Sequence, residues 1–378
     1  MSSSHAAADT RLRHIDTLRA VAAILVLWQH VGEVFVHLNG AVALGGSRLQ
    51  EFASSINVGR IGVVAFFLIS GFVIPFSIQP GQASPVRTFL VKRFFRIYPA
   101  YWLSVPLGAL TGYWIWGREF TAADFLVNLT LLQDLFGMRA AEGLYWTLLV
   151  ELVFYALCVA LLLTRSLDKP RRLLALAYVF GGVYVLAMLM RWLGLPSVGT
   201  SVAFGFLNLS IMLCGTLYRS LLDDSPAMER VDRAGTRLLI ASYLVILPAA
   251  TVPMIGFSPN AQISYALGML LFLAGTTWLR VQARLTDWLG RISYSIYLFH
   301  PVVFLAMLWL LQRLPQDSWW RTRHLLVYLV ANLLLTVAFA TLVYRWVERP
   351  GMRLGRSLAR AVQRRGEPGP VVAPAPVP

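Results

Sequence analysis

An arginine and a histidine share one helix face in the first apolar segment of the chain. Arg19 and His30 are eleven residues apart. At about 100° per residue, this spacing is only roughly 20° more than three full turns, so both side chains project from the same face, about 16 Å apart along the axis. Ionisable groups inside a membrane segment cost free energy and mark functional sites. The pair predicts a site where Arg19 binds an anionic carrier and His30 carries out chemistry.

Three carboxyl groups are placed to support this pair. Asp16, three residues before Arg19, is expected to pair with it at the membrane surface. Glu33 follows His30 by about one turn and is predicted to orient the imidazole or share its proton. Glu151, in another apolar segment, is predicted to lie at a similar depth and to form an acid/base pair with His30. The alternatives are a purely structural hydrogen bond for His30 and a structural ion pair for Glu151.

A basic and aromatic segment at residues 89–99 contains Lys92, Arg93 and Arg96. If this segment is helical, Arg93 and Arg96 are neighbours on one face. Guanidinium groups stay charged and bind phosphate oxygens in a bidentate manner. The segment therefore predicts a site for a phosphorylated cytoplasmic ligand. The alternative is an ordinary membrane anchor that contacts lipid headgroups.

Further polar side chains lie inside apolar segments. His300 precedes Pro301, and its alternative role is to satisfy backbone groups that the proline leaves unpaired. Hydrogen-bond donors inside the membrane can stabilise negative charge that develops during a reaction. The candidate donors are Ser70, Tyr145, Thr147 and His300.

The composition is that of a membrane protein that crosses the bilayer many times. Of 378 residues, 57% are hydrophobic and 13% are charged, against about 45–50% and about 25% in soluble domains. The net charge of +15 is explained by cytoplasmic loops rich in Lys and Arg, so nucleic acid is not an expected partner. The sequence has no Walker, GxGxxG, HExxH or GxSxG motif and no Cys/His metal spacing, so no metal site is expected.

The apolar segments predict an all-α bundle of about ten transmembrane helices. Lys and Arg are about three times as frequent on the side that holds both ends of the chain. Both termini are therefore predicted to be cytoplasmic, in the inner (cytoplasmic) membrane. Residues 1–350 are expected to form one membrane domain and 351–378 a basic, Pro-rich cytoplasmic tail that begins with a helix on the inner leaflet. The predicted spans are 15–37, 58–78, 98–116, 143–164, 173–191, 203–219, 238–256, 261–279, 292–311 and 324–344.

Six motifs, taken together, resemble those of the acyltransferase 3 family of integral membrane acyltransferases. They are residues 14–20 with His30, then 62–72, 93–99, 145–155, 293–301 and 348–350. The resemblance implies ten helices, cytoplasmic acyl-CoA as the donor substrate, and transfer to a hydroxyl, often on an envelope or secreted saccharide. Family habit favours acetyl as the acyl group, with no permanently bound cofactor.

The family pattern also implies roles for individual residues. Arg19, Arg93 and Arg96 match the cations associated with the CoA donor, and His30 matches the catalytic histidine. Two positions depart from many relatives, which have an acid where this chain has Val64 and a second acid where it has Leu152. These departures limit any transfer of acceptor specificity from the family.

Combined, these features predict a mechanism. Arg93 and Arg96, with Lys92 nearby, hold the CoA phosphates, and Arg19 guides the pantetheine arm. His30 acts as general base on the acceptor hydroxyl, oriented by Glu151 or Glu33. An acyl-histidine intermediate is an equally valid route.

Two alternatives belong to other functional classes. One is a transporter or flippase for an anionic or lipid-linked solute, although the two halves show no paired Gly/Pro-broken helices. The other is a degenerate relative that acts as an assembly partner.

Overall fold

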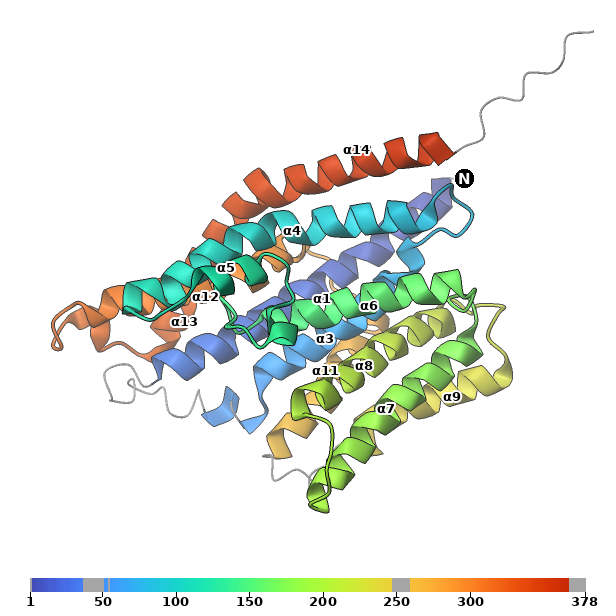
Figure 1. Ribbon diagram of the computed structural model, residues 1–378, viewed down its shortest axis with the longest axis horizontal. Helices are drawn as coiled ribbons and strands as arrows, with labels where there is room; N and C mark the ends of the chain where they lie inside the picture. The colour runs from blue at the N-terminus through green and yellow to red at the C-terminus, as the bar shows by residue number, and fades with distance from the viewer. Residues whose placement is uncertain (1, 37–50, 54, 247–258, 367–378) are drawn as a thin grey trace, which may run out of the picture.

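The chain folds as a bundle of helices with seven stretches long and apolar enough to cross a membrane. The computed structural model describes residues 2–36, 51–53, 55–246 and 259–366. Within these residues about 80% of the chain is helical and no β-strand occurs. The predicted all-α membrane architecture is therefore confirmed at this level (Figure 1).

The main helices follow one another along the chain with short connections. They are α1 (Ser2–Phe35), α3 (Val58–Val73), α4 (Pro85–Gly112), α5 (Ala122–Asn128), α6 (Tyr145–Leu163), α7 (Pro170–Trp192), α8 (Thr200–Leu222), α9 (Arg230–Ala241), α11 (Pro259–Thr277), α12 (Arg284–Gln312), α13 (Leu325–Val343) and α14 (Arg349–Gly366). Parts or all of α1, α3, α6, α7, α8 and α12, and the continuous stretch of α13 with α14, make up the seven apolar stretches.

Three predicted spans fall outside those seven stretches. The predicted span 98–116 belongs to α4, which begins at Pro85 and so includes the basic residues that precede the apolar segment. The span 238–256 begins in α9 and continues as a short π-helix, Ser242–Ile246, while residues 247–256 lie outside the described residues. The span 261–279 corresponds to α11, in which Ile263–Thr277 is the apolar helical stretch among the described side chains.

Helix α1 lies between α3 and α12 (Figure 1), and close backbone contacts fix its position. Gly62 of α3 lies against the carbonyl of Ala22, and Gly290 of α12 lies against the backbone of Asp16. A Cβ atom at either glycine would collide with the α1 backbone. Small residues of this kind let membrane helices approach closely, so the helix that carries Arg19 and His30 is held from both sides.

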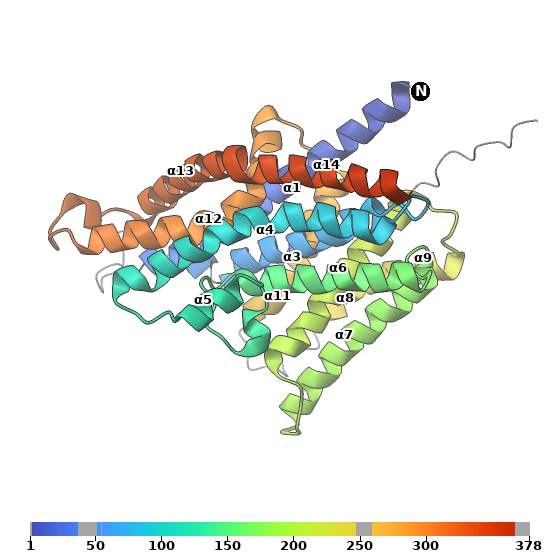
Figure 2. The same cartoon turned by 45° about the horizontal axis from the view of Figure 1, so that its top comes forward.

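Helix α13 continues through the π-helix Tyr344–Glu348 into α14, which lies along α4 in both ribbon views (Figures 1 and 2). Gly355 contacts the side chain of Phe95 on α4, and Gly351 contacts Pro99. The helix predicted after residue 350 is thus present, with α4 as its packing partner. The Pro-rich residues 367–378 lie outside the described residues.

Candidate active site

Two cavities lie next to each other inside the bundle. The histidine cavity, lined by His30, has a volume of about 580 Å³. The arginine cavity, lined by Arg19, has a volume of about 130 Å³. Val63, Thr147 and Tyr297 line both, so the two cavities meet at these side chains.

His30 of α1 is hydrogen-bonded to His300 of α12. The distance from His30 Nδ1 to His300 Nε2 is 2.9 Å, and His300 Nδ1 is 2.7 Å from the carbonyl oxygen of Tyr297. That carbonyl lacks its usual helical donor because the residue four positions later, Pro301, has no N–H. His300 is fully buried and satisfies this carbonyl, as its alternative role predicted, while also binding His30.

The chain of hydrogen bonds assigns the tautomers of both rings. A carbonyl oxygen only accepts, so His300 Nδ1 carries a proton and, in the neutral ring, Nε2 is an acceptor. His30 Nδ1 must then donate to His300, which leaves a lone pair on His30 Nε2. No described residue hydrogen-bonds to that nitrogen. His30 therefore lines the histidine cavity with one ring nitrogen bonded to His300 and the other left as an acceptor.

The two acids predicted to orient His30 have other partners. Glu33 lines the histidine cavity and accepts a hydrogen bond of 2.5 Å from Gln29 Nε2. Glu151 lines the arginine cavity and accepts a hydrogen bond of 2.6 Å from the Tyr155 hydroxyl. The predicted pairing of Glu151 with His30 is thus corrected: depth along a helix axis does not fix the direction of a side chain around it.

Arg96 of α4 is neutralised within the bundle. It pairs with Glu348, which is 1% exposed and accepts a second hydrogen bond of 2.6 Å from Ser295 Oγ. The guanidinium carbon lies 5.3 Å from the ring centre of Tyr294. Arg96 thus joins α4 to α12 and to the π-helix before α14.

Arg93 and Arg19 remain without an acidic partner in the described part of the chain. Arg93 donates to Ser77 Oγ at 2.6 Å and lies 5.4 Å from the ring centres of both Phe89 and Tyr155. Arg19 lines the same cavity and forms no hydrogen bond with any described residue. The arginine cavity therefore presents two guanidinium groups that an anionic ligand can bind.

Two other residues predicted near this donor site lie differently. Lys92 is exposed on α4 and is not among the residues that line the arginine cavity. Asp16 forms no ion pair with Arg19 among the described contacts.

The predicted oxyanion donors differ in accessibility. Ser70 lines the arginine cavity. The Thr147 hydroxyl donates to the Leu144 carbonyl at 2.9 Å and lies 2.7 Å from the Tyr297 hydroxyl. Tyr145 is buried, lines neither cavity and bonds to Ser104 at 2.8 Å, so it is corrected to a structural residue.

Comparison with known proteins identifies the class of chemistry. The sequence matches the family model of an acyltransferase domain over residues 12–345. The chain belongs to this acyltransferase family. No solved structure matches it.

Two relatives align with most of this acyltransferase. Nodulation protein 10 of Rhizobium leguminosarum bv. viciae is 26% identical over 91% of the chain and 94% of its own length. The peptidoglycan O-acetyltransferase OatA of Listeria monocytogenes is 25% identical over 89% of the chain. The alignment spans only 55% of that second relative.

Some lining residues of the acyltransferase's histidine cavity had no sequence signal. Apart from Gln29, which lies in the later part of α1, they belong to loops or to the ends of helices, where polar residues are common, and only their place around the cavity distinguishes them. These residues are Gln29, Asn57, Arg60, Arg118, Glu142 and Trp146.

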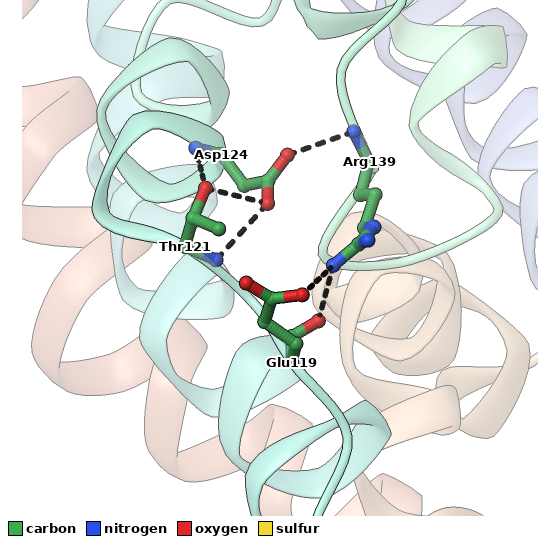
Figure 3. A network of polar contacts seen from close by, with 4 residues as sticks. All are labelled: Glu119, Thr121, Asp124 and Arg139. Atoms are coloured by element: carbon green, nitrogen blue, oxygen red, sulfur yellow. Dashed lines mark hydrogen bonds and ion pairs between the residues drawn. The ribbon is translucent and has the colours of Figure 1, made fainter.

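A polar network holds the loop that contributes Arg118 and residues 140–143 to the lining of the histidine cavity (Figure 3). Asp124 of α5 accepts hydrogen bonds from the backbone and hydroxyl of Thr121 at 3.0 and 2.8 Å and from the backbone of Arg139 at 3.1 Å. The Arg139 guanidinium pairs with Glu119 at 3.6 Å. Burial alone would raise the pKa of Asp124, but these donors outweigh burial and hold the pKa below its ordinary value.

We expect Asp124→Ala to loosen this loop, because three donors lose their acceptor. The loss is about 1–3 kcal/mol of local stability, measured as faster hydrogen exchange at the Arg139 amide. Since the pKa of Asp124 is lowered, its stabilising effect is present above the ordinary value of 3.8 and is lost as the pH falls below it. The exposed Asp134 provides the control Asp134→Asn, and equal exchange in both variants contradicts the assignment.

Proposed function

We propose that this protein transfers an acyl group, favoured to be acetyl, from cytoplasmic acyl-CoA to a hydroxyl of a saccharide, with His30 as general base. In this proposal it spans the inner membrane ten times with both termini in the cytoplasm. The observation that supports it most directly is His30, which lines the histidine cavity, has its Nδ1 bonded to His300 and leaves its Nε2 without a hydrogen bond to any described residue.

The donor is proposed to enter from the arginine cavity. The excess of Lys and Arg in predicted cytoplasmic loops supports a cytoplasmic position for this end of the bundle. CoA phosphates are too strongly hydrated to enter the bilayer, and Arg93 lies near the start of α4, where it can bind them. The small volume of about 130 Å³ suits a thin pantetheine arm that passes Arg19 and reaches Thr147 and Tyr297.

His30 then handles the proton. The acceptor oxygen attacks the thioester carbon while its proton moves to His30 Nε2, and the C=O electron pair becomes the oxyanion of a tetrahedral intermediate. As the C=O bond re-forms, the C–S bond breaks and the CoA thiolate takes the proton from the imidazolium. His300 stabilises that imidazolium by accepting from Nδ1 throughout.

An acyl-His30 intermediate uses the same nitrogen as nucleophile. Rapid quenching after the protein is mixed with labelled acyl-CoA, without acceptor, distinguishes the two routes. Only the route through acyl-His30 labels the protein before acceptor is added.

The relatives support a saccharide acceptor. OatA is named as a peptidoglycan O-acetyltransferase, and peptidoglycan offers sugar hydroxyls. Membership of an acyltransferase family also favours acyl transfer over the transport alternative.

Turnover by the purified protein tests the proposal. With acetyl-labelled acetyl-CoA and a neutral saccharide in proteoliposomes, we expect free CoA and label on the saccharide. Binding without release of CoA, or passage of an intact solute across the bilayer, contradicts the proposal and favours transport.

A further inference from the structure

Glu142 is a buried acid that faces the histidine cavity without a partner. It is 4% exposed and lines the cavity. Neither of its carboxyl oxygens hydrogen-bonds to any described residue. A buried carboxyl in this state costs free energy that a ligand with hydrogen-bonding groups can recover.

The fold holds Glu142 in place rather than leaving it there by chance. The neighbouring amide of Ala141 donates to Asn128 Oδ1 at 2.9 Å, and Asn128 Nδ2 donates to the Arg139 carbonyl at 2.8 Å. On the facing helix α4, Gly108 leaves room for the acid, because a Cβ there would lie 2.6 Å from Glu142 Cγ. The loop and the helix are thus both shaped around this side chain.

The histidine cavity suits an uncharged, polyhydroxylated ligand. Charged side chains of both signs, Glu33 on one side of the balance and Arg60 and Arg118 on the other, line the cavity together with the uncharged side chains. Arg60 Nε is another buried group without a partner. Aromatic rings from Tyr113, Trp146 and Tyr265 add flat apolar surfaces, which match the C–H face of a sugar ring.

Burial raises the pKa of Glu142 well above its ordinary value. Burial without a described partner therefore favours the neutral acid, which donates one hydrogen bond and accepts others. A sugar hydroxyl, itself both donor and acceptor, is the matching group.

We propose that Glu142 binds ring hydroxyls of a neutral saccharide acceptor, which enters the histidine cavity from the extracytoplasmic end and presents one hydroxyl to His30. This inference rests on the proposed function and adds the residue that positions the acceptor. The direction of entry follows from α4, which has Arg93 near its start and Gly112, at the histidine cavity, at its end. Gly143 and Arg118 at that cavity are exposed.

Kinetics with a neutral tetramer of N-acetylglucosamine as acceptor test the role of Glu142. We expect Glu142→Met to raise the acceptor KM at least about tenfold and to leave acetyl-CoA binding unchanged. Glu142→Gln should restore much of the loss, because the amide resembles the neutral acid. The unfolding temperature of Glu142→Met should not fall, since an unpaired acid is removed. An unchanged acceptor KM overturns the proposal. A higher acceptor KM accompanied by a lower unfolding temperature of Glu142→Met overturns it as well.

Cysteine protection tests the same subsite without turnover. The two native cysteines are buried, and Gly143→Cys adds a thiol where no described atom lies within 4 Å of the new Cβ. We expect a membrane-impermeant maleimide to label it from the extracytoplasmic side only. The neutral tetramer should slow labelling, and added Glu142→Met should abolish that protection, whereas added Asp317→Asn, an exposed acid at neither cavity, should not.

The outcomes separate this inference from the proposed function. Protection by the tetramer without any thioester cleavage supports the subsite and contradicts acyl transfer. Cleavage of acetyl-CoA without protection overturns the subsite alone. Protection only by the cationic glucosamine tetramer, or labelling only from the cytoplasmic side, also overturns it.

Discussion

Replacing His30 with Ala is expected to lower the rate of acyl transfer by roughly 10²–10⁴-fold, the range of general acid–base catalysis. The variant loses the imidazole ring that lines the histidine cavity, while Arg19 and Arg93 still line the arginine cavity. Acyl-CoA affinity should therefore stay within about twofold of the wild type. Labelled acyl-CoA binding and single-turnover release of CoA measure the two effects separately.

A variant at His300 separates positioning from proton transfer. His300→Phe keeps a ring in the buried site but removes the acceptor for His30 Nδ1, so the tautomer of His30 is no longer fixed. We expect a smaller loss than in His30→Ala and a changed pH profile of transfer, with donor affinity retained. Full transfer activity in His30→Ala contradicts the general-base role, whatever His300→Phe shows.

The sequence was sufficient to predict which side chains share one face of a single helix. The eleven-residue spacing placed Arg19 and His30 on one face of α1, and they line adjoining cavities. His300 was identified as a buried polar residue beside a proline, but its bond to His30 joins residues 270 positions apart. Such a contact depends on how α12 is rotated against α1, and a single sequence contains no information on that rotation.

The errors have the same origin. Glu151 was assigned to His30 from depth alone, yet α6 turns it toward Tyr155 and the arginine cavity. The predicted span 98–116 does not include the basic first part of α4, where Arg96 is paired with Glu348 inside the bundle. Glu142 lies in a loop, where an acid is usually solvated, and only the fold buries it.

Arg93→Gln is expected to weaken acyl-CoA binding about 10- to 100-fold, the equivalent of about 1.5–3 kcal/mol for a charged hydrogen bond. Arg93 lines the arginine cavity and forms no ion pair with any described acid, since Glu151 in the same lining is bonded to Tyr155, so Arg93 can bind a phosphate in the proposed mechanism. The turnover rate at saturating donor should change little. Equilibrium binding of labelled acyl-CoA measures the effect, and Lys92→Gln, one residue away and exposed, is the matched control. Equal affinity in Arg93→Gln and wild type returns Arg93 to the membrane-anchor alternative.

Arg96→Gln should behave differently, although the sequence motif groups it with Arg93. Removing this guanidinium leaves Glu348 buried with only Ser295 as a partner. An unpaired buried charge costs about 3–5 kcal/mol, so the main expected effect is a lower unfolding temperature. Adding Glu348→Gln should restore much of that stability. If the double variant is stable yet still fails to bind acyl-CoA, Arg96 contacts both Glu348 and the donor. If acyl-CoA binding returns, the role of Arg96 is to join α4, α12 and α14 around the cavity.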